Sequence, residues 1–348
     1  MNTLSRLAAL GAVGLILGFA ACSKDNPEPE PTPTPTPGGG TEKPGQKTKS
    51  YINPVYNVDS PDPSIQRGPD GTFYAFTTNG MRKSDDLINW TRVNGPFDVR
   101  PSWSEVCHDI WAYDCNEVDG RYLLYYALSK WGEGLANGIG VAVSDKIEGP
   151  YTDHGKLFTS SEIGVINSID PQYFEEAGKK YLIWGSFNGL FYVELSDDGL
   201  SLAEGAKAVQ IAGNAYEGVL VHKHEGKYYM FASTGSCCEG NNSTYTTVVG
   251  RSDSFFGPYV DRNGTSMMDN HHETVIKGND RVKGPGHNSE IITDDKGTDW
   301  ILYHGYMSNA PDNGRVLLMD QIIWQDGWPT VRGSQPSTIG TEGPSFGN

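Results

Sequence analysis

The chain has 348 residues, which is enough for one large domain or two ordinary ones. Hydrophobic residues make up 37% and charged residues 20%, as in a globular protein with a sizeable core, and the 43 glycines, 21 prolines and 18 tyrosines favour many short strands over long helices. The net charge of -16 argues against nucleic acid and other polyanions as partners and is compatible with a neutral substrate.

The first residues predict export. Residues 1–21 contain one basic residue, Arg6, followed by the apolar run Leu7–Ala21, which is shorter than the about 20 apolar residues that a transmembrane helix needs. Two alanines precede Cys22, and the segment resembles a bacterial lipoprotein signal, in which the cysteine is lipidated and becomes the mature N-terminus. Phe19 departs from the leucine that is usual at its position, and ordinary secretion with an incidental cysteine is the alternative.

A tether is predicted over residues 22–50. Its segment 27–37 reads PEPEPTPTPTP, which cannot pack a core, favours polyproline II and reaches roughly 34 Å. Residues 38–50 are polar and rich in glycine. We therefore expect a protein that is secreted through the inner membrane and lipid-anchored to the outer membrane. Residues 23–26 also indicate exposure at the cell surface.

A repeat dominates residues 51–348. A glycine turn followed by an aromatic-rich strand occurs five times, and the turns begin at Gly71, Gly120, Gly178, Gly226 and Gly297. A period of about 40–60 residues with about four strands in each unit is typical of a β-propeller. The prediction is an all-β fold, a five-bladed β-propeller, over residues 51–348. A sandwich or jelly roll is the alternative, but neither has a fivefold repeat.

The strand before each glycine turn is expected to line the central channel. Each of these strands begins with a polar residue, namely Asp62, Asp109 or Asp114, Asp170, Glu217 and His287. Equivalent positions on five inner strands face one end of the axis, so four carboxylates and a histidine should meet there. A single Asp-Pro pair is better explained by a turn. A set of carboxylates that repel one another can hold different pKa values, as glycoside hydrolysis requires.

The same segments carry a resemblance to a known family. The sequences DPSI at 62–65, IDP at 169–171 and YEG at 216–218 resemble the catalytic segments of glycoside hydrolase family 43, whose members are five-bladed propellers. The motifs GSCC, NSTY, VGRS, GPY and GPGHNS follow in this order between residues 235 and 289 and are similar to the endo-α-1,5-L-arabinanases of that family. The resemblance implies hydrolysis of arabinan, a neutral pentose polysaccharide, and we expect a monomer.

The resemblance also implies roles for single residues. Asp62 would be the general base, Glu217 the general acid, and Asp170 would orient Glu217 and raise its pKa. Because enzymes of the family invert the configuration at the anomeric carbon, the carboxyls of Asp62 and Glu217 should lie about 6.5–9.5 Å apart. His287 matches a histidine that helps to hold a calcium ion, bound mostly by water, whose role would be electrostatic. A hydrogen-bonded structural histidine is the alternative.

Several residues are candidates for substrate binding. Asn167, Ser186 and Phe187 match segments that contact sugar in the family. Trp111, Phe187 and Trp131 could stack on pentose rings, although each aromatic residue taken alone is more often part of a core.

Two departures from the family pattern leave alternatives open. Pro61 replaces a common histidine and Tyr113 a proline, and we expect both at the edge of the site. An exo-acting α-L-arabinofuranosidase or β-xylosidase of the same family, or a non-catalytic carbohydrate-binding surface lipoprotein, are the rival functions.

The remaining cysteines are not assigned to catalysis. In an oxidising compartment Cys107 and Cys115 could pair across a loop. Cys237 and Cys238 could form a vicinal bridge or stay as thiols, and no Cys-His spacing typical of a metal site occurs.

Overall fold

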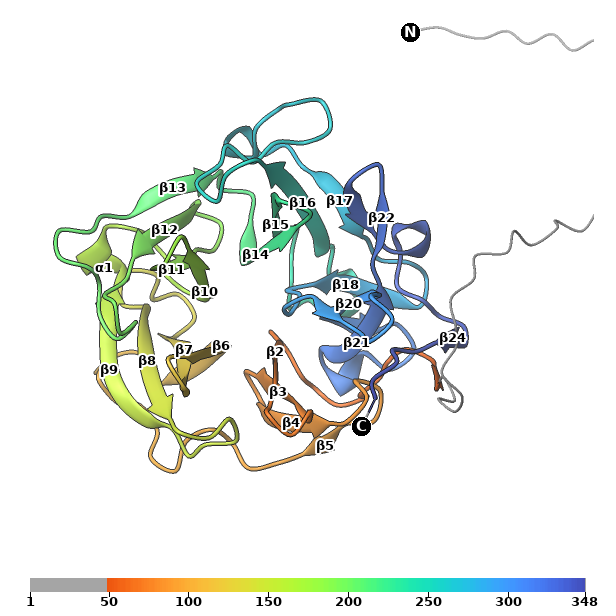
Figure 1. Ribbon diagram of the computed structural model, residues 1–348, viewed down its shortest axis with the longest axis horizontal. Helices are drawn as coiled ribbons and strands as arrows, with labels where there is room; N and C mark the ends of the chain where they lie inside the picture. The colour runs from red at the N-terminus through yellow and green to blue at the C-terminus, as the bar shows by residue number, and fades with distance from the viewer. Residues whose placement is uncertain (1–48, 348) are drawn as a thin grey trace, which may run out of the picture. The chain divides into compact units, whose positions relative to one another are not determined.

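The computed structural model describes residues 49–347, which form five four-stranded antiparallel sheets around a central axis (Figure 1). This is the predicted five-bladed β-propeller. The first strand of each sheet lies nearest the axis, and the chain visits the blades in sequence order (Figure 1). The signal segment 1–21 and all but the last residues of the tether, 22–48, lie outside the described residues.

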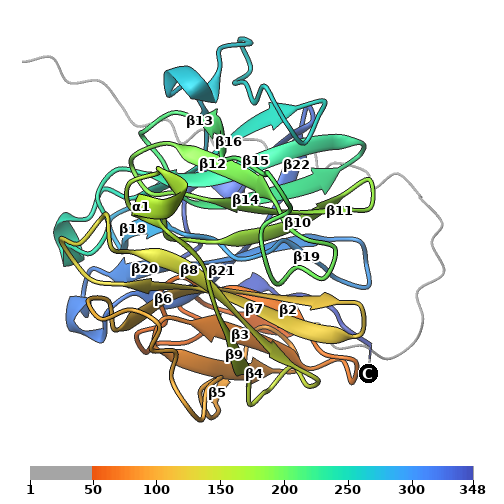
Figure 2. The same cartoon turned by 90° about the vertical axis from the view of Figure 1, so that its left-hand side faces the viewer.

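Each of the first three blades is built from four consecutive strands of the chain. Blade 1 contains β2 (Ser64–Arg67), β3 (Phe73–Thr77), β4 (Gly80–Ser84) and β5 (Thr91–Arg92). Blade 2 contains β6 (Asp109–Val118), β7 (Arg121–Ser129), β8 (Gly138–Ser144) and β9 (Thr152–Thr159). The short helix α1 (Ser160–Ile163), visible in Figure 2, leads to blade 3. Blade 3 contains β10 (Gln172–Glu176), β11 (Lys179–Trp184), β12 (Leu190–Glu194) and β13 (Val209–Ala212).

The last two blades carry the smaller elements. Blade 4 contains β14 (Glu217–His224), β15 (Lys227–Thr234), β16 (Thr246–Ser252) and β17 (Glu273–Ile276). Blade 5 contains β18 (Val282–Gly286), β19 (Ile292–Thr293), β20 (Asp299–Met307) and β21 (Val316–Gln321). Short hairpin strands β22 (Ile323–Gln325) and β23 (Trp328–Thr330) follow. Four 3-10 turns are η1 (Gly240–Asn242), η2 (Met267–Asp269), η3 (Pro311–Asn313) and η4 (Arg332–Ser334).

The repeated glycines are explained by their backbone conformation. All five have a positive φ, between 76° and 89°, at Gly71, Gly120, Gly178, Gly226 and Gly297. Glycine adopts this region without steric cost, so it recurs wherever the inner strand of a blade turns back into the second strand.

The core lies between the blades. Five clusters of buried apolar side chains each join two neighbouring blades, and the fifth joins blade 5 to blade 1. Central strands are therefore covered on both faces, which explains why β7 and β20 are almost continuously apolar and aromatic. Within residues 49–347, no helix has the length and apolar character that crossing a membrane requires.

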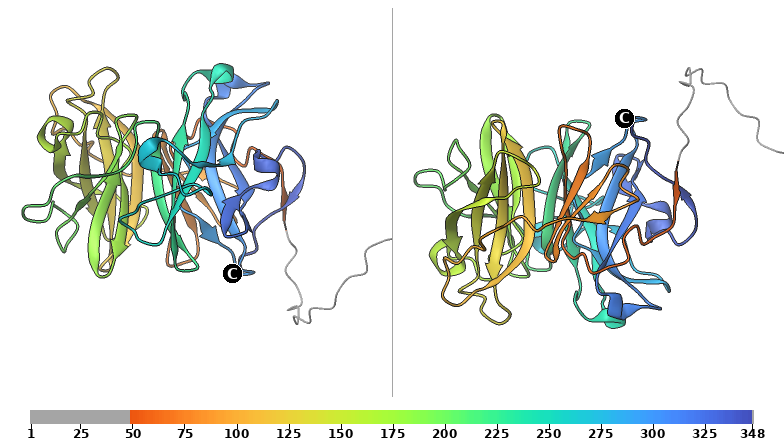
Figure 3. Two further views of the ribbon diagram at one scale, coloured as in Figure 1. Left: turned by 90° about the horizontal axis from the view of Figure 1, so that it is seen from above. Right: turned by 90° about the horizontal axis from the view of Figure 1, so that it is seen from below.

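The start of the domain closes the ring. The amide of Val55 donates to the carbonyl of Leu317 on β21, and the amide of Leu317 donates to the carbonyl of Tyr56, at 3.0 and 3.1 Å. Strand β1 (Ser50–Tyr51) pairs with β24 (Thr341–Glu342) near the C-terminus, beside the last blade (Figure 3). Residues from both ends of the domain thus cover the outer edge of blade 5.

The inner strand of blade 5 differs from the prediction. It was expected to begin at His287, but β18 and β19 both pair with β20, and residues 287–291 lie between them outside either strand, where only the amide of Ser289 donates to the carbonyl of Leu302 on β20. The chain makes its break after Gly286, where an added Cβ would lie 2.3 Å from the ring of Tyr245. His287 consequently lies in a gap of the strand, with a left-handed φ of 47°.

Candidate active site

One cavity of about 510 Å³ is lined by residues from all five blades. Each predicted catalytic or substrate-binding residue lies on its wall, as does the predicted calcium ligand: Asp62, Asp170, Glu217, Asn167, Ser186, Phe187, Trp111 and His287. Trp131, Tyr245 and Arg315 also line it. The structure therefore brings together residues that are more than 200 positions apart in the chain.

Blade 2 does not contribute the expected carboxylate. Asp109 is exposed, Asp114 is buried behind the cavity, and neither lines it. The backbone of β6 bulges at Ala112, which has a φ of 41°, and the bulge shifts the register so that Trp111 lines the cavity. The cavity thus holds three carboxylates, and the prediction of four was wrong.

Asp62 is held in its ionised form. Arg315 donates to its Oδ1 at 3.1 Å, and Thr78 donates to its Oδ2 at 2.7 Å. His287 Nδ1 lies 3.3 Å from the same Oδ1. Burial alone would raise the pKa of Asp62, but the Arg315 guanidinium, followed by the two neighbouring histidines, holds that pKa well below its usual range. Asp62 is therefore a proton acceptor at neutral pH.

His304 is hydrogen-bonded to the backbone of Asp62. The amide of Asp62 donates to His304 Nδ1 at 3.1 Å, so the neutral ring carries its proton on Nε2. Burial and the nearby Arg315 charge hold the pKa of His304 well below its usual range. Its Nε2 is buried and has no hydrogen-bond partner among residues 49–347.

Glu217 lies in a different environment. Ser186 Oγ donates to Glu217 Oε2 at 2.6 Å, and the Tyr245 hydroxyl donates to Oε1 at 2.7 Å. Burial raises the pKa of Glu217, these two hydroxyl donors lower it, and the Asp62 charge raises it again, so the net direction is upward. Glu217 thus favours its protonated form more than Asp62 does, as a general acid must.

Asp170 is coupled to Glu217. Its Oδ2 accepts the amide of Gly218, the residue next to Glu217, at 3.2 Å. Burial, and then the charges of Glu217 and Asp62, raise the pKa of Asp170 well above its usual range. The pair therefore titrates as a unit.

Backbone strain gathers at the cavity. Six non-glycine residues on its wall adopt left-handed conformations with φ between 47° and 68°: Asp62, Asn167, Asp170, Phe187, Cys238 and His287. This region of backbone conformation is uncommon for residues other than glycine, asparagine and aspartate. Residues held in it by their surroundings cluster at functional sites.

An aromatic surface continues from the carboxylates. The rings of Trp111 and Trp131 lie 5.3 Å apart between centroids and are tilted by 52°. Phe187 is 39% exposed and Trp131 is 73% exposed. Asn137 donates to the side chain of Asn167 at 2.8 Å and fixes it at the wall. Exposed rings beside buried carboxylates suit the apolar faces of sugars.

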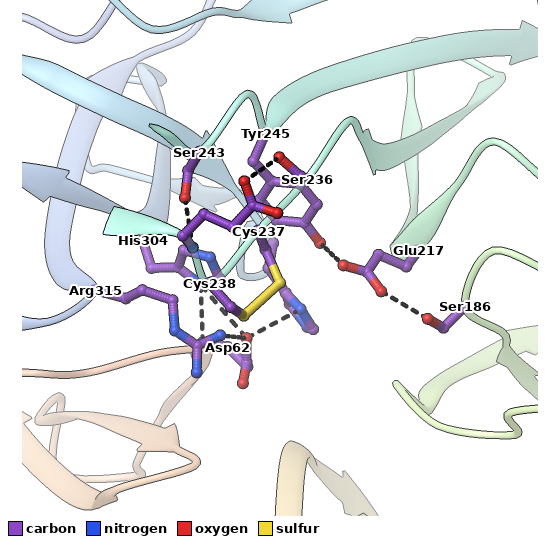
Figure 4. Close-up of a disulfide and its surroundings, with 12 residues drawn as sticks. Asp62, Ser186, Glu217, Ser236, Cys237, Cys238, Ser243, Tyr245, His304 and Arg315 are labelled. Atoms are coloured by element: carbon purple, nitrogen blue, oxygen red, sulfur yellow. Dashed lines mark hydrogen bonds and ion pairs between the residues drawn. A yellow bond between two sulfur atoms is a disulfide. The ribbon is translucent and has the colours of Figure 1, made fainter. Parts of the chain in front are cut away.

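The cysteines occur in two forms. Cys237 and Cys238 form a vicinal disulfide on the wall of the cavity that Asp62 and Arg315 also line, and Figure 4 draws these residues together. Cys107 and Cys115 are free and buried, so the prediction that they could pair was wrong. Cys107 Sγ instead lies 3.4 Å from Asn137 Oδ1, and Cys115 Sγ lies 3.3 Å from the Tyr151 hydroxyl.

The two departures from the family pattern lie behind the cavity wall. Tyr113 packs into the core between blades 1 and 2, and Pro61 is buried, where its carbonyl accepts the amide of Thr78. Neither residue lines the cavity, in contrast to the expectation that both lie at its edge.

Three contacts of the carboxylates were missed from sequence. Arg315, His304 and Tyr245 surround Asp62 and Glu217, yet they come from β20 or from segments between strands. Tyr245 ends the motif NSTY quoted above, and His304 ends the segment DWILYH at 299–304, so these motifs were the available signal for the two residues. No sequence motif pointed to Arg315, which lies 253 residues from Asp62 in the chain.

Two buried carboxyls in one cavity, with pKa values displaced in opposite directions, have the properties that glycoside hydrolysis requires. The chain belongs to the glycosyl hydrolases family 43, whose family model matches residues 51–329. It is similar to the extracellular endo-α-(1→5)-L-arabinanase 1 of Bacillus subtilis (strain 168), at 33% identity over 72% of this chain and 80% of that protein.

Two further similarities concern related activities. The extracellular exo-α-(1→5)-L-arabinofuranosidase ArbA of Cellvibrio japonicus (strain Ueda107) is 32% identical over 79% of this chain and 86% of that protein. A solved structure of the Cellvibrio cellulosa α-L-arabinanase in complex with arabinohexaose has a TM-score of 0.73 at 30% identity. The match covers 79% of this chain and 96% of that one.

Proposed function

We propose that this protein hydrolyses α-1,5-linked L-arabinan at internal bonds. The observation that carries the proposal is the unlike state of two carboxyls in one cavity. Arg315 keeps Asp62 ionised, while burial raises the pKa of Glu217. The endo-acting arabinanase among the similar proteins supports this substrate and mode of action.

In the proposed reaction, water attacks the anomeric carbon in a single displacement with inversion. Asp62 accepts the proton of that water, and Glu217 donates a proton to the leaving oxygen. Asp170 orients Glu217 by accepting the amide of the neighbouring Gly218. The expected separation of about 6.5–9.5 Å between the carboxyls of Asp62 and Glu217 stays a prediction.

Exo action on the same polymer is the second candidate. The similarity to an exo-acting arabinofuranosidase favours it. The exposed Trp131 beyond the carboxylates favours a binding surface for more than one sugar, and hence the endo mode.

A calcium ion near His287 is also proposed. The ring of His287 lines the cavity, and the buried Nε2 of His304 and Oδ1 of Asn288 have no partners among the described residues, which suits polar occupants such as water around an ion. No three His, Cys, Asp or Glu side chains gather at His287 in residues 49–347. Its shell would therefore be mostly water, and it would supply positive charge near Asp62.

We further propose that the protein acts outside the cell. The export signal, the lipidated Cys22 and the tether 22–50 would hold a monomeric catalytic domain at the outer membrane, facing its polysaccharide. Two similar proteins that are extracellular support secretion. Labelling with a radioactive fatty acid in the wild type and in Cys22→Ser tests the anchor, and incorporation into both would exclude it.

Product analysis on linear and branched arabinan tests the activity. We expect a ladder of oligosaccharides from the wild type, against arabinose alone for an exo enzyme. Asp62→Asn and Glu217→Gln should abolish turnover, while Asp109→Asn, an exposed carboxylate away from the cavity, should leave it unchanged. Saturable arabinan binding without new reducing ends in the wild type would instead indicate a carbohydrate-binding lipoprotein.

A further inference from the structure

Two histidines and an aspartate form a cluster at the other end of blade 4 from Glu217. His222 and His224 are alternate residues near the end of β14, so their side chains leave the same face of the strand. Asp299 is the first residue of β20 in blade 5. One ligand atom from each residue lies within 4.8 Å of the other two, and no other set of this kind occurs in residues 49–347.

We propose that His222, His224 and Asp299 bind a divalent transition-metal ion of the Zn²⁺ type. Bonds of about 2.0–2.1 Å at a tetrahedral centre place ligand atoms roughly 3.3 Å apart. His224 Nδ1 lies 3.7 Å from Asp299 Oδ2, so side-chain adjustments of a few tenths of an ångström bring this pair to ligand spacing. Two imidazoles and a carboxylate suit zinc, and the fourth position is left for water.

The surroundings orient the ligands as neighbours of a metal site do. Thr293 donates to Asp299 Oδ1 at 2.6 Å, and Trp324 Nε1 donates to Oδ2 at 2.7 Å. Each carboxylate oxygen has a second lone pair, so these bonds leave Asp299 free to bind an ion. The ring of Trp324 stacks on His224 with centroids 3.7 Å apart and planes within 4°. Such supporting contacts fix the ligands before the metal arrives.

The nitrogen atoms are available to a metal. A neutral imidazole keeps a lone pair on one ring nitrogen, and this nitrogen is the atom that binds a metal. His222 and His224 are each partly exposed, which gives an ion a path from solvent. The simpler alternative is an aromatic stack that holds β14 against β22 without any metal.

The site is separate from the carboxylates. His222 is five residues from Glu217 along β14, or roughly 17 Å at the usual rise of a strand. A metal there would join blades 4 and 5 without touching the substrate. It should therefore raise stability by mass action and leave arabinan turnover unchanged.

Calorimetric titration with Zn²⁺ tests the site. The chain would be purified without a histidine tag and treated with EDTA. We expect one Zn²⁺ per chain in the wild type and in His154→Gln, a matched control for an exposed histidine of blade 2. His222→Gln and His224→Gln should bind at least about tenfold more weakly. Zn²⁺ should raise the thermal midpoint only in the wild type and the control, and Co²⁺ should give visible absorption bands at the same stoichiometry.

Two results would overturn the proposal. One is the absence of saturable binding at one ion per chain, and the other is unchanged affinity in the two glutamine variants. His224→Gln loses a ring that stacks on Trp324 and could fail to fold. His222→Gln then decides, because the ring of His222 lies 6.3 Å from that of Trp324 and contributes less to the stack.

Discussion

Replacing Arg315 should move the acidic limb of the pH–rate profile. The guanidinium lies 3.1 Å from Asp62 Oδ1, and two unit charges at this distance interact by about 5 kcal/mol at an effective dielectric constant of 20. That figure is a ceiling, because an arginine beside an aspartate typically lowers its pKa by about 1–3 pH units, equivalent to roughly 1.4–4 kcal/mol. Arg315→Met should therefore raise the pKa of Asp62 by about 1–3 pH units.

The acidic limb should move to higher pH because Asp62 is the proposed general base. A general base works in its ionised form, so a higher pKa makes activity fall off at higher pH on the acidic side. The measurement is kcat/KM on linear arabinan oligosaccharides between pH 3 and pH 8, which reports groups of the free enzyme. Below the new pKa the rate should decrease about tenfold for each pH unit.

Arg315→Lys is the matched control. Lysine keeps the positive charge but loses the planar geometry of the guanidinium, so its acidic limb should stay close to that of the wild type even where kcat is lower. An unchanged limb in Arg315→Met, or an equal displacement in both variants, would refute the account of how Asp62 is kept ionised.

Changes at Tyr245, at Asp114 and at the proposed calcium site should each have a measurable effect. Tyr245→Phe removes a hydroxyl donor from Glu217 and should therefore raise the pKa of Glu217 and move the basic limb of the pH–rate profile to higher pH. The lost hydrogen bond should cost roughly 1.5–3 kcal/mol of stabilisation. A basic limb that stays in place would contradict this prediction. Asp114→Asn should raise the thermal midpoint at pH 7. Burial and then the Glu290 charge raise the pKa of Asp114, so this aspartate stabilises the fold least above that pKa and most below its unfolded value near 3.8, and the gain should shrink toward pH 4. A larger gain at pH 4 than at pH 7 would reverse the sign. Chelation followed by assay in metal-free buffer should lower kcat in the wild type and leave the residual rate of His287→Ala unaltered; equal rates with and without calcium in the wild type would remove the proposed ion.

Local patterns in the sequence were enough to predict the repeat of the fold and the main carboxylates. Gly71 and its four counterparts mark turns that need a positive φ, and the strands after them are aromatic because both of their faces pack against neighbouring blades. These signals are local, since each resides in a few consecutive residues. The segments around Asp62, Asp170 and Glu217 could be found for the same reason, and all three residues line the cavity.

The surroundings of each carboxylate could not be predicted from local sequence patterns. A bulge at Ala112 turned Trp111 to the cavity and left Asp114 behind it, and a break after Gly286 moved His287 out of its expected strand. Arg315 reaches Asp62 across 253 residues of sequence. The pKa of a buried carboxyl depends on burial and on the charges within a few ångströms, and both are set by chain segments that meet only after the ring of blades has closed.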